Sequence, residues 1–182
     1  MEIENENNSI LLKNKFQDIF LKSFKKDRIC FNPGCKEIAI NSHILSKNGI
    51  IRSISQNKHL YLVDNSRYLF QQKLRFNKIG INDALTFKGF CQKHDNEIFR
   101  SIEQNSDINF SNYSTQLLLS YRGILNELRK KEILIDVYNT MRKNEEVYLK
   151  LELQIFEEFY TGLKIGLKDL ETYKSFIEKM MK

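Results

Sequence analysis

The two stretches Cys30-Phe31-Asn32-Pro33-Gly34-Cys35 and Gly89-Phe90-Cys91-Gln92-Lys93-His94-Asp95 decide the fold of this 182-residue chain. The first is a C-x4-C pair across a Pro-Gly reversal, in which proline fixes φ and glycine accepts a positive φ. The second is a C-x2-H pair. Two short-range ligand pairs separated by a long insert are how structural zinc sites are usually delivered. The sequence therefore predicts one tetrahedral zinc site with four ligands: Cys30, Cys35, Cys91 and His94.

Two other interpretations of these residues stay open. Free cysteine is often a small buried hydrophobe, so the thiols can instead be ordinary core residues. The chain has 3 cysteines, an odd number that argues against a closed disulfide framework and favours thiols kept reduced and available for metal. His43 is the alternative to His94 as the fourth ligand.

The composition is that of an ordered, helix-leaning protein. Hydrophobic residues make up 41% of the chain and proline occurs once, and a chain of this length can bury a core. No apolar run reaches the roughly 18 to 20 residues that span a bilayer, and the acidic, Asn-rich N-terminus lacks the features of a signal peptide. We therefore expect a cytoplasmic protein with no membrane contact.

The net charge of +6 is unevenly distributed. Residues 1–100 contain 17 Lys/Arg and 10 Asp/Glu, whereas residues 101–182 contain 12 and 13. Neutralisation of phosphates supplies most non-specific affinity for nucleic acid. The excess of positive charge beside the predicted metal site therefore favours DNA or RNA as a partner.

Three segments follow from the hydrophobic pattern. The hydrophobic pattern of residues 1–26 predicts an N-terminal amphipathic helix, because apolar side chains recur there at helical spacing. Residues 27–105 have short elements separated by turns and form the predicted zinc module. Residues 106–182 predict a helical C-terminal region, with a break near 140–145 that makes a pair of long antiparallel helices. The expected fold class is α+β, mostly α.

Within the predicted zinc module, local signals place four elements. Ser46 can cap a short helix that ends near Ile54. The β-branched and aromatic runs His59–Val63 and Arg67–Leu74 predict a hairpin. A further helix is expected over Asp95–Gln104, directly after the C-x2-H pair.

The order of a cysteine knuckle, Ser42-His43, a hairpin and Gly89-Phe90-Cys91-x-x-His94-Asp95 resembles the HNH, or ββα-metal, nucleases in their zinc-stabilised treble-clef form. It is also similar to uncharacterised bacterial proteins, some found near phage-defence genes, that share the S-H and G-F-C-x-x-H-D motifs and a helical region. The resemblance covers about residues 28–105. It implies a small treble-clef or ββα-like module.

The resemblance also implies catalytic roles. In such nucleases a histidine activates water, an asparagine orients the histidine, and a divalent cation stabilises the leaving oxygen. By position, His43 is the general base, Asn82 the orienting residue and Asp95 a ligand of catalytic Mg²⁺ or Mn²⁺. The chain departs from the pattern at Ser42, where the family has Asp, Glu or His, and Asn82 lies nine residues before Cys91.

Structural roles compete with these functional ones. His43 can be a buried, hydrogen-bonded histidine, and Asp95 can complement the dipole at the start of a helix. Arg122 and Glu127 are predicted to be helix-surface charges. A mixed basic and aromatic set can form either a nucleic-acid surface or a solvated sheet face: Lys47, Arg52, Lys58, Tyr61, Arg67, Tyr68, Phe70, Lys73, Arg75, Phe76, Lys78, Phe87, Lys88 and Lys93.

Two hypotheses for function result. The preferred one is a zinc-stabilised, HNH-like bacterial protein that binds DNA or RNA in anti-phage defence, with endonuclease activity left open. The alternative is a non-catalytic zinc-stabilised scaffold whose C-terminal helices bind a protein partner or a second copy of the chain.

Overall fold

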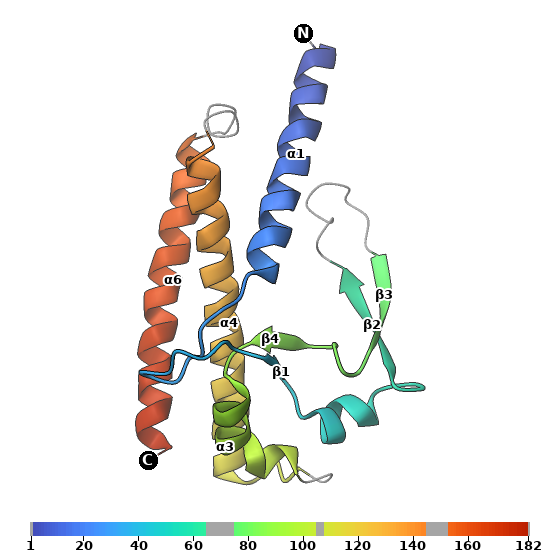
Figure 1. Cartoon of the computed structure of the whole chain (residues 1–182), viewed down its shortest axis with the longest axis vertical. Helices are drawn as coiled ribbons and strands as arrows, with labels where there is room; N and C mark the ends of the chain where they lie inside the picture. Colours follow the sequence, from blue (N-terminus) through green and yellow to red (C-terminus); the bar gives the residue numbers. More distant parts are fainter. Residues whose placement is uncertain (1, 65–74, 105–107, 145–152, 182) are drawn as a thin grey trace. The chain divides into compact units, whose positions relative to one another are not determined.

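The computed structural model describes residues 2–64, 75–104, 108–144 and 153–181 (Figure 1). These residues are mostly helical with a small β part, which confirms the predicted α+β, mostly α fold class. The chain forms two compact units: unit 1 is Met1–Lys26 with Lys130–Glu171, and unit 2 is Asp27–Arg129 with Thr172–Lys182. The three-segment division expected from the sequence stays a prediction, because compact units need not coincide with independently folding domains.

Unit 1 is built from three helices. α1 (Glu2–Lys25) packs with the C-terminal part of α4 (Tyr113–Arg142) and the N-terminal part of α6 (Leu153–Met180). The apolar side chains of the three helices form one core: Val137, Met141 and Phe156, surrounded by the partly buried Leu12, Phe16, Ile19, Phe20 and Tyr138. The predicted N-terminal helix therefore packs part of its apolar surface against the long C-terminal helices, while its exposed side chains include Ile10, Leu11, Leu21 and Phe24.

α4 and α6 run antiparallel within each unit, as their side-chain pairs indicate. In unit 1, the Tyr160 hydroxyl donates a hydrogen bond to Asn139 at 2.7 Å. In unit 2, the Tyr121 hydroxyl donates to Glu178 at 2.6 Å. The earlier residue on α4, Tyr121, pairs with the later residue on α6, Glu178, and the later residue on α4, Asn139, pairs with the earlier residue on α6, Tyr160. This order agrees with the predicted antiparallel pair. α4 ends at Arg142, inside the break expected near residues 140–145.

Unit 2 contains two small antiparallel sheets. β1 (Asn41–His43) pairs with β4 (Thr86–Lys88), and β2 (His59–Asp64) pairs with β3 (Arg75–Gly80). The predicted strand His59–Val63 matches β2. Its predicted partner, Arg67–Leu74, lies outside the described residues, and the described partner strand begins at Arg75.

Two helical segments of unit 2 lie near the predicted positions. The backbone N–H of Gly49 donates to the Ser46 hydroxyl at 3.2 Å, so Ser46 caps η1 (Lys47–Ile51) as predicted. α3 (Gln92–Glu103) begins three residues before the expected Asp95. The predicted start is wrong because the helix begins between the two ligands: Cys91 is its N-cap, and His94 belongs to its first turn.

The core of unit 2 is aromatic and centres on Phe90, which is 1% exposed. Its ring lies 6.3 Å from that of Phe31, 5.9 Å from that of Phe99 and 6.2 Å from that of Tyr121, measured between centroids. Phe31 belongs to the turn that carries the first cysteine pair, Cys30–Cys35, which we call the knuckle. Phe99 belongs to α3 and Tyr121 to α4. Phe90 therefore joins the elements that carry and support the predicted metal ligands.

Two arginines of α4 are buried in unit 2, Arg122 at 1% and Arg129 at 5% exposure. The prediction that Arg122 is a surface charge is therefore wrong, whereas Glu127 is exposed as expected. Arg129 donates from Nε to the Lys88 carbonyl at 2.6 Å and from Nη2 to the Ile29 carbonyl at 2.9 Å. These bonds attach α4 to the backbone on both sides of the knuckle.

In the part of the chain that the structure describes, no helix combines the length and the apolar character needed to cross a membrane.

Arg129→Met should lower the free energy of unfolding by about 3 kcal/mol, because two backbone carbonyls lose a charged donor from a buried side chain. Urea unfolding followed by circular dichroism measures the change. Arg100→Met is the control, because Arg100 is exposed on α3 and should change stability by less than about 0.5 kcal/mol. Equal effects of the two substitutions would contradict the proposed anchoring role of Arg129.

Candidate metal centre

The first ligand pair is shaped by a tight turn. The Cys35 N–H donates to the Asn32 carbonyl at 3.0 Å, and Gly34 has φ of +77°. This is a type II turn with Pro33 and Gly34 at its centre, and a side chain at the second central position would be strained. The Cys30 N–H also donates to the Glu37 carbonyl at 3.0 Å. The loop therefore returns on itself and brings the two thiols close together.

The second ligand pair is held beside the first by backbone hydrogen bonds. The Phe31 N–H donates to the Gly89 carbonyl at 3.0 Å, and the Ile40 N–H donates to the Phe90 carbonyl at 2.8 Å. A Cβ atom at Gly89 would lie 2.7 Å from the Phe87 ring, so the glycine allows the ring to approach. Directly after this contact, Cys91 begins α3.

The four predicted ligand atoms converge. The Cys35 and Cys91 Sγ atoms are 3.9 Å apart, and His94 Nδ1 lies 3.5 Å from Cys30 Sγ and 3.2 Å from Cys91 Sγ. All four atoms lie within 4.8 Å of one another. A tetrahedral zinc ion with ordinary bond lengths places sulfur atoms about 3.8 Å apart, and sulfur and nitrogen about 3.6 Å apart. The Cys3His group therefore fits a metal ion such as zinc, and it includes His94, whereas His43 lies outside it.

The local environment acts differently on the thiols. Burial raises the pKa of Cys30, whose sulfur also accepts the Asn32 N–H at 3.4 Å. The backbone N–H of His94 lowers the pKa of Cys91, which lies at the start of a helix where thiolates are favoured. Cys30 and Cys91 are buried, and Cys35 and His94 are partly exposed. The metal ligands thus lie at the edge of the aromatic core.

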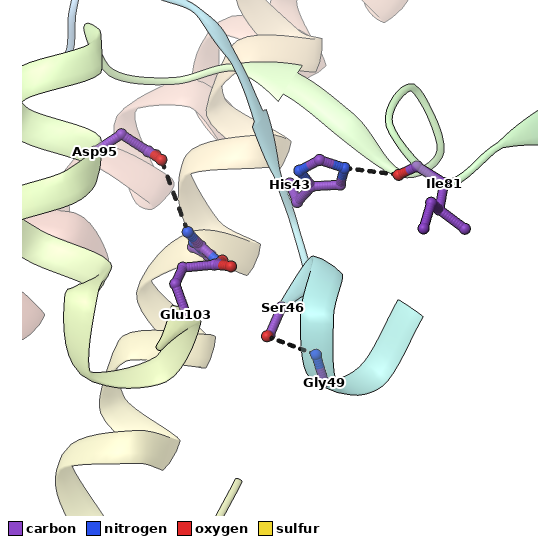
Figure 2. Close-up of polar contacts among 7 residues, drawn as sticks. His43, Ser46, Gly49, Ile81, Asp95 and Glu103 are labelled. Carbon is purple, nitrogen blue, oxygen red and sulfur yellow. Dashed lines mark hydrogen bonds and ion pairs between the residues drawn. The ribbon is translucent and has the colours of Figure 1, made fainter. Parts of the chain in front are cut away.

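His43, the candidate general base, lies at the end of β1 and is partly buried. Its Nε2 is 2.9 Å from the Ile81 carbonyl (Figure 2). A carbonyl only accepts, so Nε2 carries the proton and Nδ1 is the basic nitrogen of the neutral ring. The neighbouring Asn82 is exposed. The orienting contact that the resemblance implied for Asn82 is made by the backbone carbonyl immediately before it.

Asp95, the candidate ligand of a catalytic cation, lies in the first turn of α3 with its side chain 13% exposed. Its Oδ2 is 3.9 Å from Arg122 Nη2, and Arg122 Nη1 donates to Glu103 at 2.5 Å. Figure 2 shows Asp95 and His43 directed toward different partners. Asp95 therefore already has a cationic neighbour, and its role as a catalytic ligand stays a prediction.

Sequence reasoning missed Arg122 as a component of this region. The guanidinium lies 4.0 Å above the Phe99 ring and pairs with two carboxylates. A signal was present: Leu118, Arg122, Leu125 and Arg129 recur at intervals of four, three and four, the spacing of a single helix face. The two buried leucines on this stripe indicate that its arginines are buried as well.

No protein-family model, curated protein or solved structure matches this chain.

Cys91→Ser should reduce bound metal from about one ion per chain to near zero, because it removes one of four ligands. Elemental analysis of purified protein measures the metal content. His43→Ala should retain the metal, because His43 lies outside the Cys3His group. Loss of metal from His43→Ala with retention in Cys91→Ser would overturn this ligand set.

Proposed function

We propose that this chain is a zinc-stabilised, HNH-like protein that binds nucleic acid. The observation that carries the proposal is the location of the Cys3His group in unit 2, the unit that holds the excess positive charge. The resemblance of the ligand and S-H motifs to HNH nucleases supports the same proposal. The proposed bacterial setting in anti-phage defence rests on that resemblance.

Zinc is the metal that suits this donor set best. Three thiolates and one imidazole at tetrahedral separations match structural zinc sites, whereas Mg²⁺ and Ca²⁺ take oxygen ligands. Four protein ligands leave no position for water or substrate. A zinc ion at Cys30, Cys35, Cys91 and His94 therefore has a structural role, and the surface that it supports carries the function.

The charge of the two units supports a polyanionic partner. Unit 2 contains 17 Lys/Arg and 10 Asp/Glu, whereas unit 1 contains 12 and 13. Several cations of unit 2 are exposed: Lys36, Arg52, Lys58, Lys78, Lys93 and Arg100. Phosphate groups attract such a surface without sequence preference, because the interaction depends on charge.

Binding to labelled DNA should be measurable by fluorescence anisotropy at low salt. The affinity should fall steeply as the salt concentration rises, because the release of counterions from the DNA then contributes less free energy to binding. Arg52→Glu in unit 2 should weaken binding several-fold. Lys143→Glu, an exposed substitution in unit 1, is the control and should have little effect.

Absence of binding to DNA and RNA at low salt would contradict the proposal. It would favour the alternative scaffold, for which α6 offers exposed apolar side chains that include Phe159, Tyr173 and Phe176.

Cleavage of nucleic acid is a second candidate function, favoured by the hydrogen bond between His43 and the Ile81 carbonyl. The bond fixes the imidazole and makes Nδ1 the proton acceptor, as a general base at neutral pH requires. His43 would take a proton from water, and the resulting hydroxide would attack the phosphorus. Mg²⁺ or Mn²⁺ at Asp95 would supply charge stabilisation of the leaving oxygen, and Asp95 would then have to loosen its pairing with Arg122.

His43→Ala should abolish cleavage of plasmid, linear DNA or RNA in the presence of Mg²⁺ or Mn²⁺, while metal content and DNA affinity stay unchanged. Gel electrophoresis of the products measures the activity. Lys143→Ala is the control, because Lys143 is exposed in unit 1, outside the unit that carries His43 and the excess positive charge. Wild-type protein that leaves all three substrates intact would remove the nuclease hypothesis and leave the binding proposal standing.

A further inference from the structure

The β2–β3 hairpin exposes two aromatic rings on one face. In the antiparallel register, Tyr61 lies opposite Lys78 and Val63 lies opposite Phe76, and directly opposed residues share a face. Tyr61 is 67% exposed, Phe76 66% and Val63 45%. We call these four residues the Tyr61–Phe76 face.

The apolar side chains on the other face of the same hairpin are less exposed. They are Leu60, Leu62 and Ile79, which are all partly buried. The most exposed large apolar side chains of the two strands therefore lie together on the Tyr61–Phe76 face. Large exposed rings on that face are consistent with a binding surface.

The charge around this face favours an anionic occupant. Among the described side chains, Lys58 and Lys78 are exposed, with Lys58 in the turn directly before β2 and Lys78 on the face itself. Aromatic rings beside exposed cations are the combination that single-stranded nucleic acid requires, because bases stack on the rings while phosphates contact the cations.

We propose that the Tyr61–Phe76 face binds single-stranded nucleic acid, with unpaired bases stacked on Tyr61 and Phe76 and phosphates near Lys58 and Lys78. This inference rests on the proposed function and specifies where and in which form the nucleic acid binds. The rings lie diagonally across the two strands, so neighbouring bases of an extended strand can each contact one ring. Bases in a duplex are already stacked on one another and do not offer the same contact.

The test compares an oligothymidine with a duplex of equal length by fluorescence anisotropy, using the full chain at low salt. Wild-type protein should bind the single strand more tightly. Tyr61→Ala and Phe76→Ala should each weaken that binding about tenfold, whereas Tyr61→Phe and Phe76→Tyr should preserve it because the ring remains. Tyr113→Ala is the matched control, because Tyr113 is a similarly exposed tyrosine, at 58%, that belongs to α4 and not to the hairpin.

Equal affinity of Tyr61→Ala, Phe76→Ala and wild type would overturn the inference while leaving the proposed function intact, and so would tighter binding of the duplex. Failure of the wild type to bind any nucleic acid would overturn both. Photocrosslinking of a bromouracil oligonucleotide to wild-type protein tests the same face without substitutions. The crosslinked peptides should come from His59–Asp64 or Arg75–Gly80, and crosslinks confined to other segments would contradict the inference.

Discussion

The convergence of three sulfur atoms and one imidazole nitrogen is the constraint on which unit 2 depends. Cys35 and Cys91 are separated by 56 positions in the chain, and Cys30 and His94 by 64. Closing a flexible loop of this length costs roughly 3–4 kcal/mol beyond a constant. Structural zinc sites in small peptides supply about 10–16 kcal/mol, so a zinc ion bound by this group would more than offset this cost. Because β1 follows the knuckle and β4 precedes Cys91, the same closure brings these strands together as neighbours.

Two buried arginines of α4 hold the elements that carry the candidate metal ligands. Arg129 donates to backbone carbonyls at Ile29 and Lys88, while Arg122 lies between the Phe99 ring and two carboxylates of α3. A buried charge lowers stability unless it is paired, and removal of one partner leaves the other as an unpaired buried charge. These contacts require α4, α3 and the knuckle to meet in one geometry. They therefore connect the metal site to a helix that supplies none of its ligands.

The parts predicted from the sequence are those governed by local chemistry. The Pro33-Gly34 turn, the Ser46 cap, the long helices and the ligand spacing each depend on residues close together in the chain. The burial of Arg122 was misjudged because a charged residue was assigned to the surface although it shares a helix face with the buried Leu118 and Leu125. The start of α3 was misjudged because Cys91 and His94 were placed before the helix, whereas Cys91 is its N-cap and His94 belongs to its first turn. The contact from the Ile81 carbonyl to His43 has no side-chain signature, since every residue carries a backbone carbonyl. The exposed Tyr61–Phe76 face likewise follows from strand register, which composition does not determine.

X-ray absorption spectroscopy at the zinc edge shows whether a metal ion is held by Cys30, Cys35, Cys91 and His94. Protein purified in the presence of zinc should show three sulfur neighbours at about 2.3 Å and one nitrogen at about 2.0–2.1 Å. A first shell made only of oxygen and nitrogen, or one with fewer than three sulfur atoms, would contradict the account.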